Sequence, residues 1–141
     1  MSTLTLAQTQ QILAAAFAEA RAKGYKPMGV VVVDAAGQVK AQAREDGASA
    51  LRLDIATAKA SAATGMGVSS RVLAQRAKDL PTFFTSLASV SSQKFAAQTG
   101  AVLILDAGGQ MIGAAGASGG TGDEDEAICI AGIAAAGLGQ G

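Results

Sequence analysis

Apolar residues near the start of the chain recur at the spacing of one face of an α-helix. The segment opens with Thr5 and, three residues later, Gln8, which is the arrangement of a capping box. Gly24 follows the last apolar position and is suited to end a helix in a left-handed conformation. The pattern predicts a helix that begins after Thr5 and ends at Gly24, with one face formed by Leu6, Ile12, Leu13, Ala16, Phe17 and Ala20.

The helical spacing then gives way to two similar stretches that are typical of β-hairpins. The first, VVVVDAAGQV, occupies residues 30–39, and the second, VLILDAGGQM, occupies residues 102–111. In each stretch, four apolar residues precede an Asp that can accept backbone hydrogen bonds and a Gly that can adopt a positive φ. We predict strands at residues 28–33 and 38–44 joined by a turn at 34–37, and an equivalent second hairpin. The repeat fits an internal duplication and equally fits two hairpins with the same turn chemistry.

Small apolar residues return to helical spacing between the hairpins and after the second one. Residues 50–64 and 69–77 predict two central helices, Pro81 begins a further apolar segment, and residues 123–137 predict a last helix. The whole pattern predicts a single α+β domain over residues 1–141. It is an antiparallel sheet of four to five strands, built from two β-hairpins and covered by N-terminal, central and C-terminal helices.

Composition narrows the function classes open to this domain. The 11 Lys and Arg residues balance the 11 Asp and Glu residues, and only 4% of residues are aromatic, so no nucleic-acid partner is expected. No apolar run approaches the ~20 residues of a membrane span, and no leader pattern is seen, so we expect a cytoplasmic protein without a membrane partner. The chain has no His and a single Cys129, which we interpret as a core residue. We therefore expect no metal and no cofactor.

Glycine is unusually frequent, at 18 of 141 residues. Together with helices whose faces consist of alanine, this composition leaves flat apolar surface on a domain of this size. We expect such surface to be buried between copies of the chain. The sequence therefore predicts a homo-oligomer.

The most polar feature is a run of four acids, Asp123 to Glu126, which follows a glycine-rich segment at residues 116–122. Acids in the first turn of a helix are favoured by its dipole, and we interpret Asp123 and Glu124 in this way. Four adjacent carboxylates repel each other, which raises the pKa of at least one of them unless a cation lies close by. Asp125 and Glu126 are therefore candidates for proton-transfer chemistry. The adjoining carboxylates argue against phosphate binding by the glycines, which we attribute to close backbone packing at a subunit contact.

Three charged residues of the first half of the chain have alternative interpretations. Arg44 and Asp46 are either solvated groups at the end of a strand or parts of a site, in which Arg44 would clamp a carboxylate. Lys59, among alanines, either covers an apolar helix face with its stem or binds an anion in a groove. We interpret Arg52, Arg71 and Arg76 as ordinary solvated helix positions.

Several phrases of the chain, taken in order, resemble the HbpS/GlcG-like family, which is related to the C-terminal domain of PduO-type proteins. They are the Asp34…Gly37 turn, AREDGA at 43–48, DIATAKA at 54–60, IGAAGASG at 112–119 and DEDEAICIAG at 123–132. The resemblance implies a compact α+β subunit in a symmetric oligomer. It implies a varied function as well, because some relatives bind haem or corrinoids and others accompany catabolic enzymes.

The available side chains suit proton transfer on a small unsaturated carboxylate. Arg44 and Lys59 would bind the carboxylates of the substrate, and Asp46, Asp125 or Glu126 would carry the proton. Muconate-like ring-cleavage products have these properties. We therefore predict a cofactor-independent tautomerase or an enamine/imine deaminase of a catabolic pathway.

The alternative prediction is a non-catalytic module that binds haem, a corrinoid or a small metabolite, as the resemblance implies. Haem ordinarily uses His as an iron ligand, and the chain has none. The side chains that could ligate iron in principle are Tyr25, Met28, Lys59, Met66 and Met111.

Overall fold

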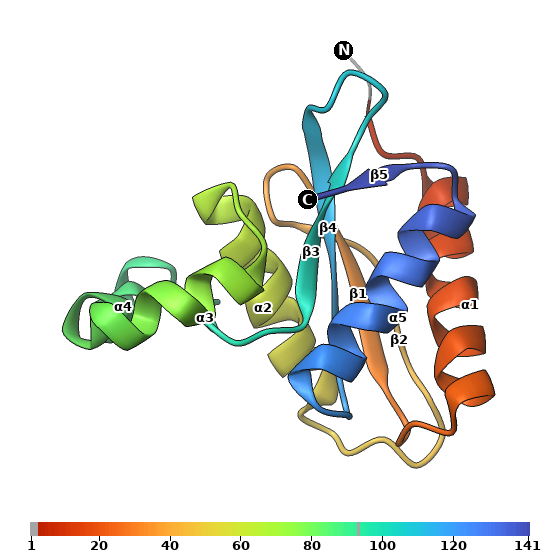
Figure 1. The fold of residues 1–141 in the computed structure, drawn as a ribbon, viewed down its shortest axis with the longest axis horizontal. Coiled ribbons are helices and arrows are strands. Elements are labelled where there is room, and N and C mark those ends of the chain that lie inside the picture. The colour runs from red at the N-terminus through yellow and green to blue at the C-terminus, as the bar shows by residue number, and fades with distance from the viewer. Residues whose placement is uncertain (1–2, 93) are drawn as a thin grey trace.

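The computed structural model, which describes residues 3–92 and 94–141, consists of an open antiparallel sheet with helices on both faces (Figure 1). The five strands are arranged in the order β2-β1-β4-β3-β5. The predicted α+β class and the number of strands are confirmed. In chain order the elements are α1 (Leu6–Lys23), β1 (Gly29–Asp34), β2 (Val39–Arg44), α2 (Arg52–Met66), α3 (Ser70–Asp79), α4 (Pro81–Val90), β3 (Ala101–Leu105), β4 (Met111–Ser118), α5 (Gly122–Ala135) and β5 (Gly139–Gln140).

The two predicted hairpins form as β1–β2 and β3–β4, and their turns have the same hydrogen bonds. Asp34 and Asp106 each accept, through Oδ1, the backbone N–H groups two and four residues later, at 2.9 and 3.0 Å. Gly37 and Gly109 both have a φ of +79°. β1 also pairs with β4, which joins the two hairpins into one sheet. The repeated sequence therefore encodes a repeated turn geometry.

The valine run of β1 is buried on both sides because the sheet is covered on both sides. Figure 1 shows α1 and α5 on one face and α2 on the other. Alternate residues of a strand point to opposite faces, so Val30 and Val32 pack towards α1 and α5 while Val31 and Val33 pack towards α2. Cys129 is fully buried in the first of these layers, as predicted.

Two glycines let the helices approach their neighbours closely. A Cβ at Gly116 of β4 would lie 2.5 Å from the carbonyl oxygen of Ala56 in α2, and a Cβ at Gly132 of α5 would lie 2.5 Å from that of Ile12 in α1. The Gly116 contact holds α2 directly against β4, and the Gly132 contact holds α5 against α1. The first contact therefore fixes how side chains of α2 can reach the end of the sheet where α5 begins.

Helices α3 and α4 extend away from the sheet as an arm (Figure 1). A small apolar cluster that contains Ala62, Leu73 and Phe84 joins the arm to α2. The outer side of α4 leaves Phe83 and Val90 exposed, together with Leu80 just before the helix. The arm places α3 beside the end of the sheet where the chain turns from β4 into α5.

Candidate functional site

A buried ion pair joins α2 to the start of α5. Lys59 Nζ donates to Asp125 Oδ2 at 3.1 Å and to the carbonyl oxygen of Ala117 at 3.0 Å. The two side chains are only 6% and 3% exposed. The second carboxylate oxygen of Asp125 accepts the backbone N–H of Gly120 at 2.9 Å. Burial raises the pKa of Asp125, and the positive charge of Lys59 opposes this rise.

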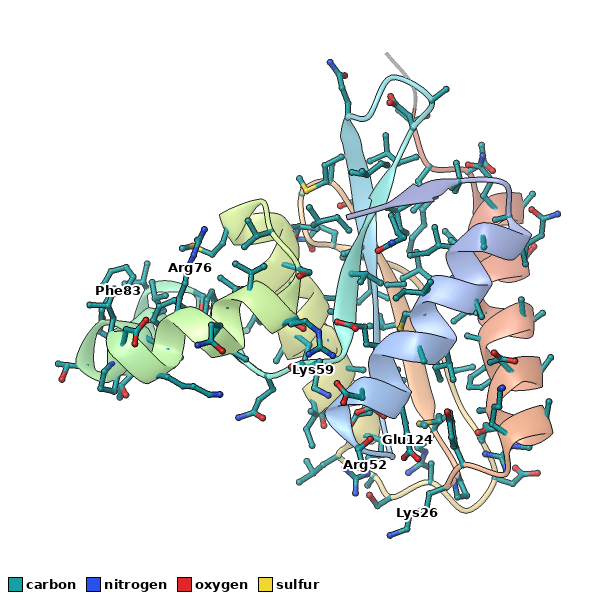
Figure 2. The ribbon with its side chains drawn as sticks, viewed as in Figure 1. Lys26, Arg52, Lys59, Arg76, Phe83 and Glu124 are labelled. Carbon is teal, nitrogen blue, oxygen red and sulfur yellow. The ribbon has the colours of Figure 1, made fainter. Side chains whose placement is uncertain are left out.

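A cleft of about 780 Å³ opens beside this ion pair, between α2, α3 and the beginning of α5. Its volume falls within the ~300–1,000 Å³ of small-molecule sites. Figure 2 shows Arg52 and Lys59 at the end of the molecule where Glu124 lies, away from Arg76 and Phe83 on the arm. We call it the cationic cleft, and its polar lining includes Arg52, Lys59, Lys78, Ser118, Thr121 and Asp125.

The cations of the cleft differ in how far their charge is neutralised. Lys59 is paired with Asp125, as described above. Arg52 donates to the hydroxyl of Ser118 at 3.2 Å, and its positive charge lowers the pKa of Asp125. Within residues 3–92 and 94–141, neither Arg52 nor Lys78 forms an ion pair with a carboxylate. The cleft therefore offers two positive charges to an anionic ligand.

The walls of the cleft also carry apolar groups. Ile55 and Ala74 line it from α2 and α3, and Ala96 lines it from the segment before β3. All three are partly exposed. A ligand with a flat apolar body and peripheral carboxylates would match this combination of surfaces.

The four acids of α5 have separate partners in the structure. Thr121 and Glu124 form a capping box, with backbone-to-side-chain hydrogen bonds of 3.0 and 3.2 Å, which confirms a helix-start role for Glu124. Arg71 of α3 binds Glu126 at 3.0 Å and also pairs with Asp123. Asp125 is paired with Lys59, so two cations, Arg71 and Lys59, offset the repulsion expected among the four acids.

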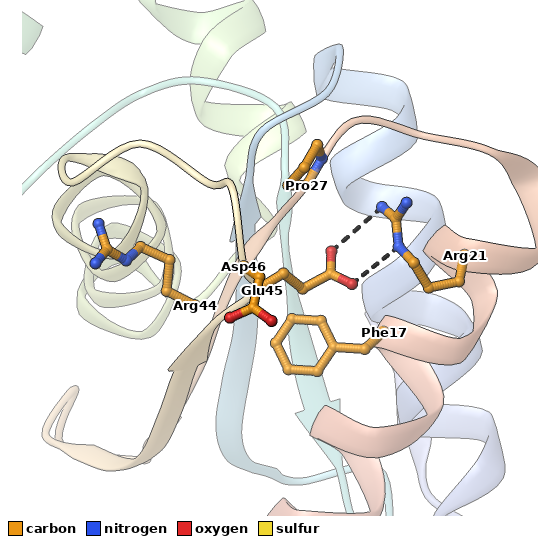
Figure 3. A pocket seen from close by; sticks show the side chains of 6 residues that line it. All are labelled: Phe17, Arg21, Pro27, Arg44, Glu45 and Asp46. Atoms are coloured by element: carbon orange, nitrogen blue, oxygen red, sulfur yellow. Dashed lines mark hydrogen bonds and ion pairs between the residues drawn. The ribbon is translucent and has the colours of Figure 1, made fainter.

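Arg44 and Asp46 lie at a different pocket, of about 470 Å³, between α1 and the end of β2 (Figure 3). There Arg21 binds Glu45 with an Nε–Oε2 distance of 2.9 Å, and Arg44 extends away from this pair. Of the five residues predicted for one site, Lys59 and Asp125 meet at the cationic cleft, whereas Arg44 and Asp46 line this other pocket. Glu126 faces Arg71 instead, so an acid–base set with Arg44 and Asp46 is not assembled.

Sequence reasoning missed three basic residues of this region. Arg52 and Arg71 were expected to be ordinary solvated positions, yet one lines the cleft and the other clamps two acids of α5. Arg52 and Lys59 are seven residues apart, which puts them on the same face of a helix, and this spacing was a usable signal. Nothing local to Lys78 indicates that α3 folds against the same cleft.

The glycine-rich segment before α5 packs within the chain. Gly119 lies against the backbone carbonyl of Pro27, and a Cβ at Gly122 would lie 2.9 Å from the Cβ of Thr99. Gly119 also has a φ of +151°, which L side chains rarely adopt. Packing within the chain therefore accounts for these glycines, and the predicted subunit contact stays a prediction.

The fold and cleft define an α+β domain that has helices on both faces of an open antiparallel sheet and a basic cleft at one end. A model of the family described as haem degrading protein HbpS-like matches residues 4–134, and the chain belongs to this family. The resemblance seen in the sequence is thereby confirmed. A comparison with curated proteins finds no match.

Solved structures extend the comparison. A PduOC:haem complex is 26% identical with a TM-score of 0.86, over 98% of each chain. An HbpS double mutant from Streptomyces reticuli is 28% identical with a TM-score of 0.82, over 95% of this chain and 87% of that one. The Klebsiella pneumoniae protein ORFY is 26% identical with a TM-score of 0.85, over 97% of this chain and 92% of that one.

These relatives overturn the predicted activity. The prediction of a muconate tautomerase or deaminase is wrong, because the family and its solved members point to haem, and a small carboxylate partner has no support among them. The physical basis of the error is that Arg44 and Asp46 line a different pocket from Lys59 and Asp125. Three broader expectations stay predictions: that the protein is an enzyme, that it forms a homo-oligomer and that it is cytoplasmic. Among the described residues, no helix combines the length and apolar character needed to cross a bilayer.

Proposed function

We propose that the protein is a haem-binding module and that haem occupies the cationic cleft. The observation that carries this proposal is the pairing of two unneutralised cations, Arg52 and Lys78, with apolar side chains in one cleft of suitable volume. The likeness to a haem complex at a TM-score of 0.86 supports the choice of ligand. Haem has an apolar macrocycle and two propionates, so it presents the complementary surfaces.

The chain's own residues would divide the binding between them. Arg52, held by Ser118, and Lys78 from the opposite wall would bind the propionates. Ile55 and Ala74 would contact the macrocycle and exclude water from it. Lys59 already has its charge satisfied by Asp125, so it holds α2, β4 and α5 in position instead of binding the ligand.

The cleft fits the periphery of haem better than it fits the iron. Haem iron is held in proteins by His, Cys, Met or Tyr, and none of these is among the residues that line the cleft. The described residues also contain no cluster of three or more potential metal ligands of the His, Cys, Asp and Glu types. We therefore propose binding of the intact molecule and derive no chemistry at iron.

Titration of the purified protein with haem tests the function. We expect saturable binding, seen as a change in the Soret band and confirmed by equilibrium dialysis. Substitution of Arg52 and Lys78 by Ala should weaken binding by about tenfold for each lost charge-assisted hydrogen bond. Arg76→Ala is the matched control, because Arg76 is an exposed arginine of α3 outside the cleft lining. Absence of saturable haem binding would refute the proposed function.

A further inference from the structure

The cleft is rich in groups that recognise carboxylates and poor in groups that coordinate iron. Arg52 and Lys78 carry the unneutralised charges, and the hydroxyls of Ser118, Thr121 and Thr99 lie on the same walls. Gly122 and Asp123, in the first turn of α5, line the cleft too. The carboxylates of the lining, Asp123 and Asp125, are paired with Arg71 and Lys59. The polar side chains of the lining that remain available can all donate hydrogen bonds to an anion.

The customary iron ligands of the described residues lie elsewhere. Met28 is fully buried against the Gly119–Gly120 turn, and Cys129 is fully buried in the core. Burial also raises the pKa of the Cys129 thiol, which keeps it protonated. Met111 lines a pocket at the β3–β4 turn. Neither the core nor that turn can present sulfur to a ligand in the cationic cleft.

Tyr25 is the nearest alternative, and it defines the competing interpretation. It lines a separate pocket of about 450 Å³, which shares Arg52, Gly120 and Thr121 with the cationic cleft. A tyrosine can act as an axial ligand of haem. Iron coordination by Tyr25 would therefore place the macrocycle on the Tyr25 side of the Gly120–Thr121 turn.

We infer that the cationic cleft recognises a tetrapyrrole through its carboxylates and apolar ring, so that the central iron is not required for binding. This inference rests on the proposed function and goes beyond it, because it names the recognised chemistry as a dicarboxylate porphyrin with or without a metal. Arg52 and Lys78 set the specificity for the carboxylates, while Ile55, Ala74 and Ala96 supply the apolar contact. Lys59 and Asp125 position the walls between which the ligand lies.

The test compares three ligands on the wild-type protein: haem, metal-free protoporphyrin IX and protoporphyrin IX dimethyl ester. Porphyrin fluorescence and Soret absorbance give the dissociation constants. We expect haem and metal-free protoporphyrin to bind within about threefold of each other and the dimethyl ester to bind at least roughly tenfold more weakly. The binding of both free acids should also weaken as salt concentration rises.

Variants separate the two interpretations. Arg52→Ala and Lys78→Ala should weaken haem and metal-free protoporphyrin by the same factor, while Tyr25→Phe and Arg76→Ala should change neither. Circular dichroism checks that each variant is folded. If a variant fails to fold, the comparison of the three ligands on the wild-type protein still decides whether binding requires the iron.

Each outcome bears on one of the two claims. Haem binding with metal-free protoporphyrin at least roughly tenfold weaker, or a loss of haem affinity alone in Tyr25→Phe, would overturn the inference and leave haem binding intact. Equal affinity for the free acid and the dimethyl ester would overturn it as well. If neither haem nor protoporphyrin binds, the proposed function and the inference are both wrong.

Discussion

The Lys59–Asp125 pair shows how a residue among alanines acquires a specific partner. The lysine stem crosses the buried surface between α2 and β4, and its amine meets Asp125 and the carbonyl oxygen of Ala117. A charge in this environment is tolerated only with a counter-charge and with its hydrogen bonds satisfied. Among the described residues, no buried side-chain nitrogen or oxygen lacks a hydrogen-bond partner. The pair therefore connects α2 to the start of α5 with the hydrogen bonds of both side chains satisfied.

Lys59→Met is expected to destabilise the protein by roughly 3–5 kcal/mol at neutral pH, because it leaves a buried carboxylate without its cation. The pKa of Asp125 is raised above 3.8 in the folded protein by burial. A carboxyl group with a raised pKa favours folding most when the pH lies below its pKa in the unfolded chain. That contribution to stability is lost as the pH rises through its pKa in the folded protein. Removal of Lys59 raises this pKa further, so the loss of stability should grow with pH.

Urea unfolding at a series of pH values measures this effect, as the difference between wild type and Lys59→Met. The double variant Lys59→Met/Asp125→Leu is the control, since an apolar pair should recover most of the lost stability. A loss that is larger in acid than at neutral pH would contradict the assigned ion pair.

At the scale of elements, small residues decide how closely the layers pack. Gly116 meets the backbone of α2, and Gly132 meets the backbone of α1. The hydrophobic pattern predicts that these helices cover the sheet, but it does not give the distance between the layers. A single glycine sets that distance, because a Cβ at its position would overlap a main-chain carbonyl group of the neighbouring helix. The separation of α2 from β4 in turn sets how far Lys59 can reach.

Gly116→Ala should therefore destabilise the protein by about 1–3 kcal/mol, since α2 must shift away from β4 to admit a methyl group. Gly65→Ala, near the end of α2, is the matched control. A Cβ at Gly65 meets nothing within 4 Å, so alanine should be neutral or stabilising by up to about 1 kcal/mol. Thermal unfolding monitored by circular dichroism measures both variants, and equal effects would show that the close contact does not matter.

At the scale of the whole molecule, the arm leaves apolar surface in contact with water. Leu80, Phe83 and Val90 are exposed, and Val90 reaches 79%. The predicted homo-oligomer would give this surface a partner.

Analytical ultracentrifugation should show a species larger than the 13.8 kDa chain. Leu80→Asp and Val90→Asp should shift it towards the monomer, whereas Leu6→Asp, an exposed apolar position on α1, should not. A 13.8 kDa species at all concentrations would rule out self-association.

Ligand binding should also appear in the stability of the whole molecule. A ligand that binds only the folded state stabilises it by about 2.7 kcal/mol at a hundredfold excess over its dissociation constant. We expect haem to raise the melting temperature of wild type and of Arg76→Ala equally. The Arg52→Ala/Lys78→Ala variant should show a smaller rise at the same haem concentration, and an equal rise would place the ligand outside the cationic cleft.

The sequence by itself determined the elements of this protein. The turn hydrogen bonds of Asp34 and Asp106 and the capping box of Thr121 and Glu124 all form between residues two to four positions apart. Such interactions leave a readable local pattern, and the uninterrupted apolar run of β1 does so too. For this reason the hairpins and the helices were predictable. The phrases that indicate the family could be read directly from the sequence.

Only the tertiary structure decided which charged residues form a site. Lys59 and Asp125 are 66 positions apart, and no local pattern states that they meet while Arg44 and Asp46 face another pocket. Their meeting depends on how closely α2 packs on β4 and on where α3 folds back beside α5. Those distances are set by contacts between residues remote in the chain, and a linear pattern of residue types does not contain them.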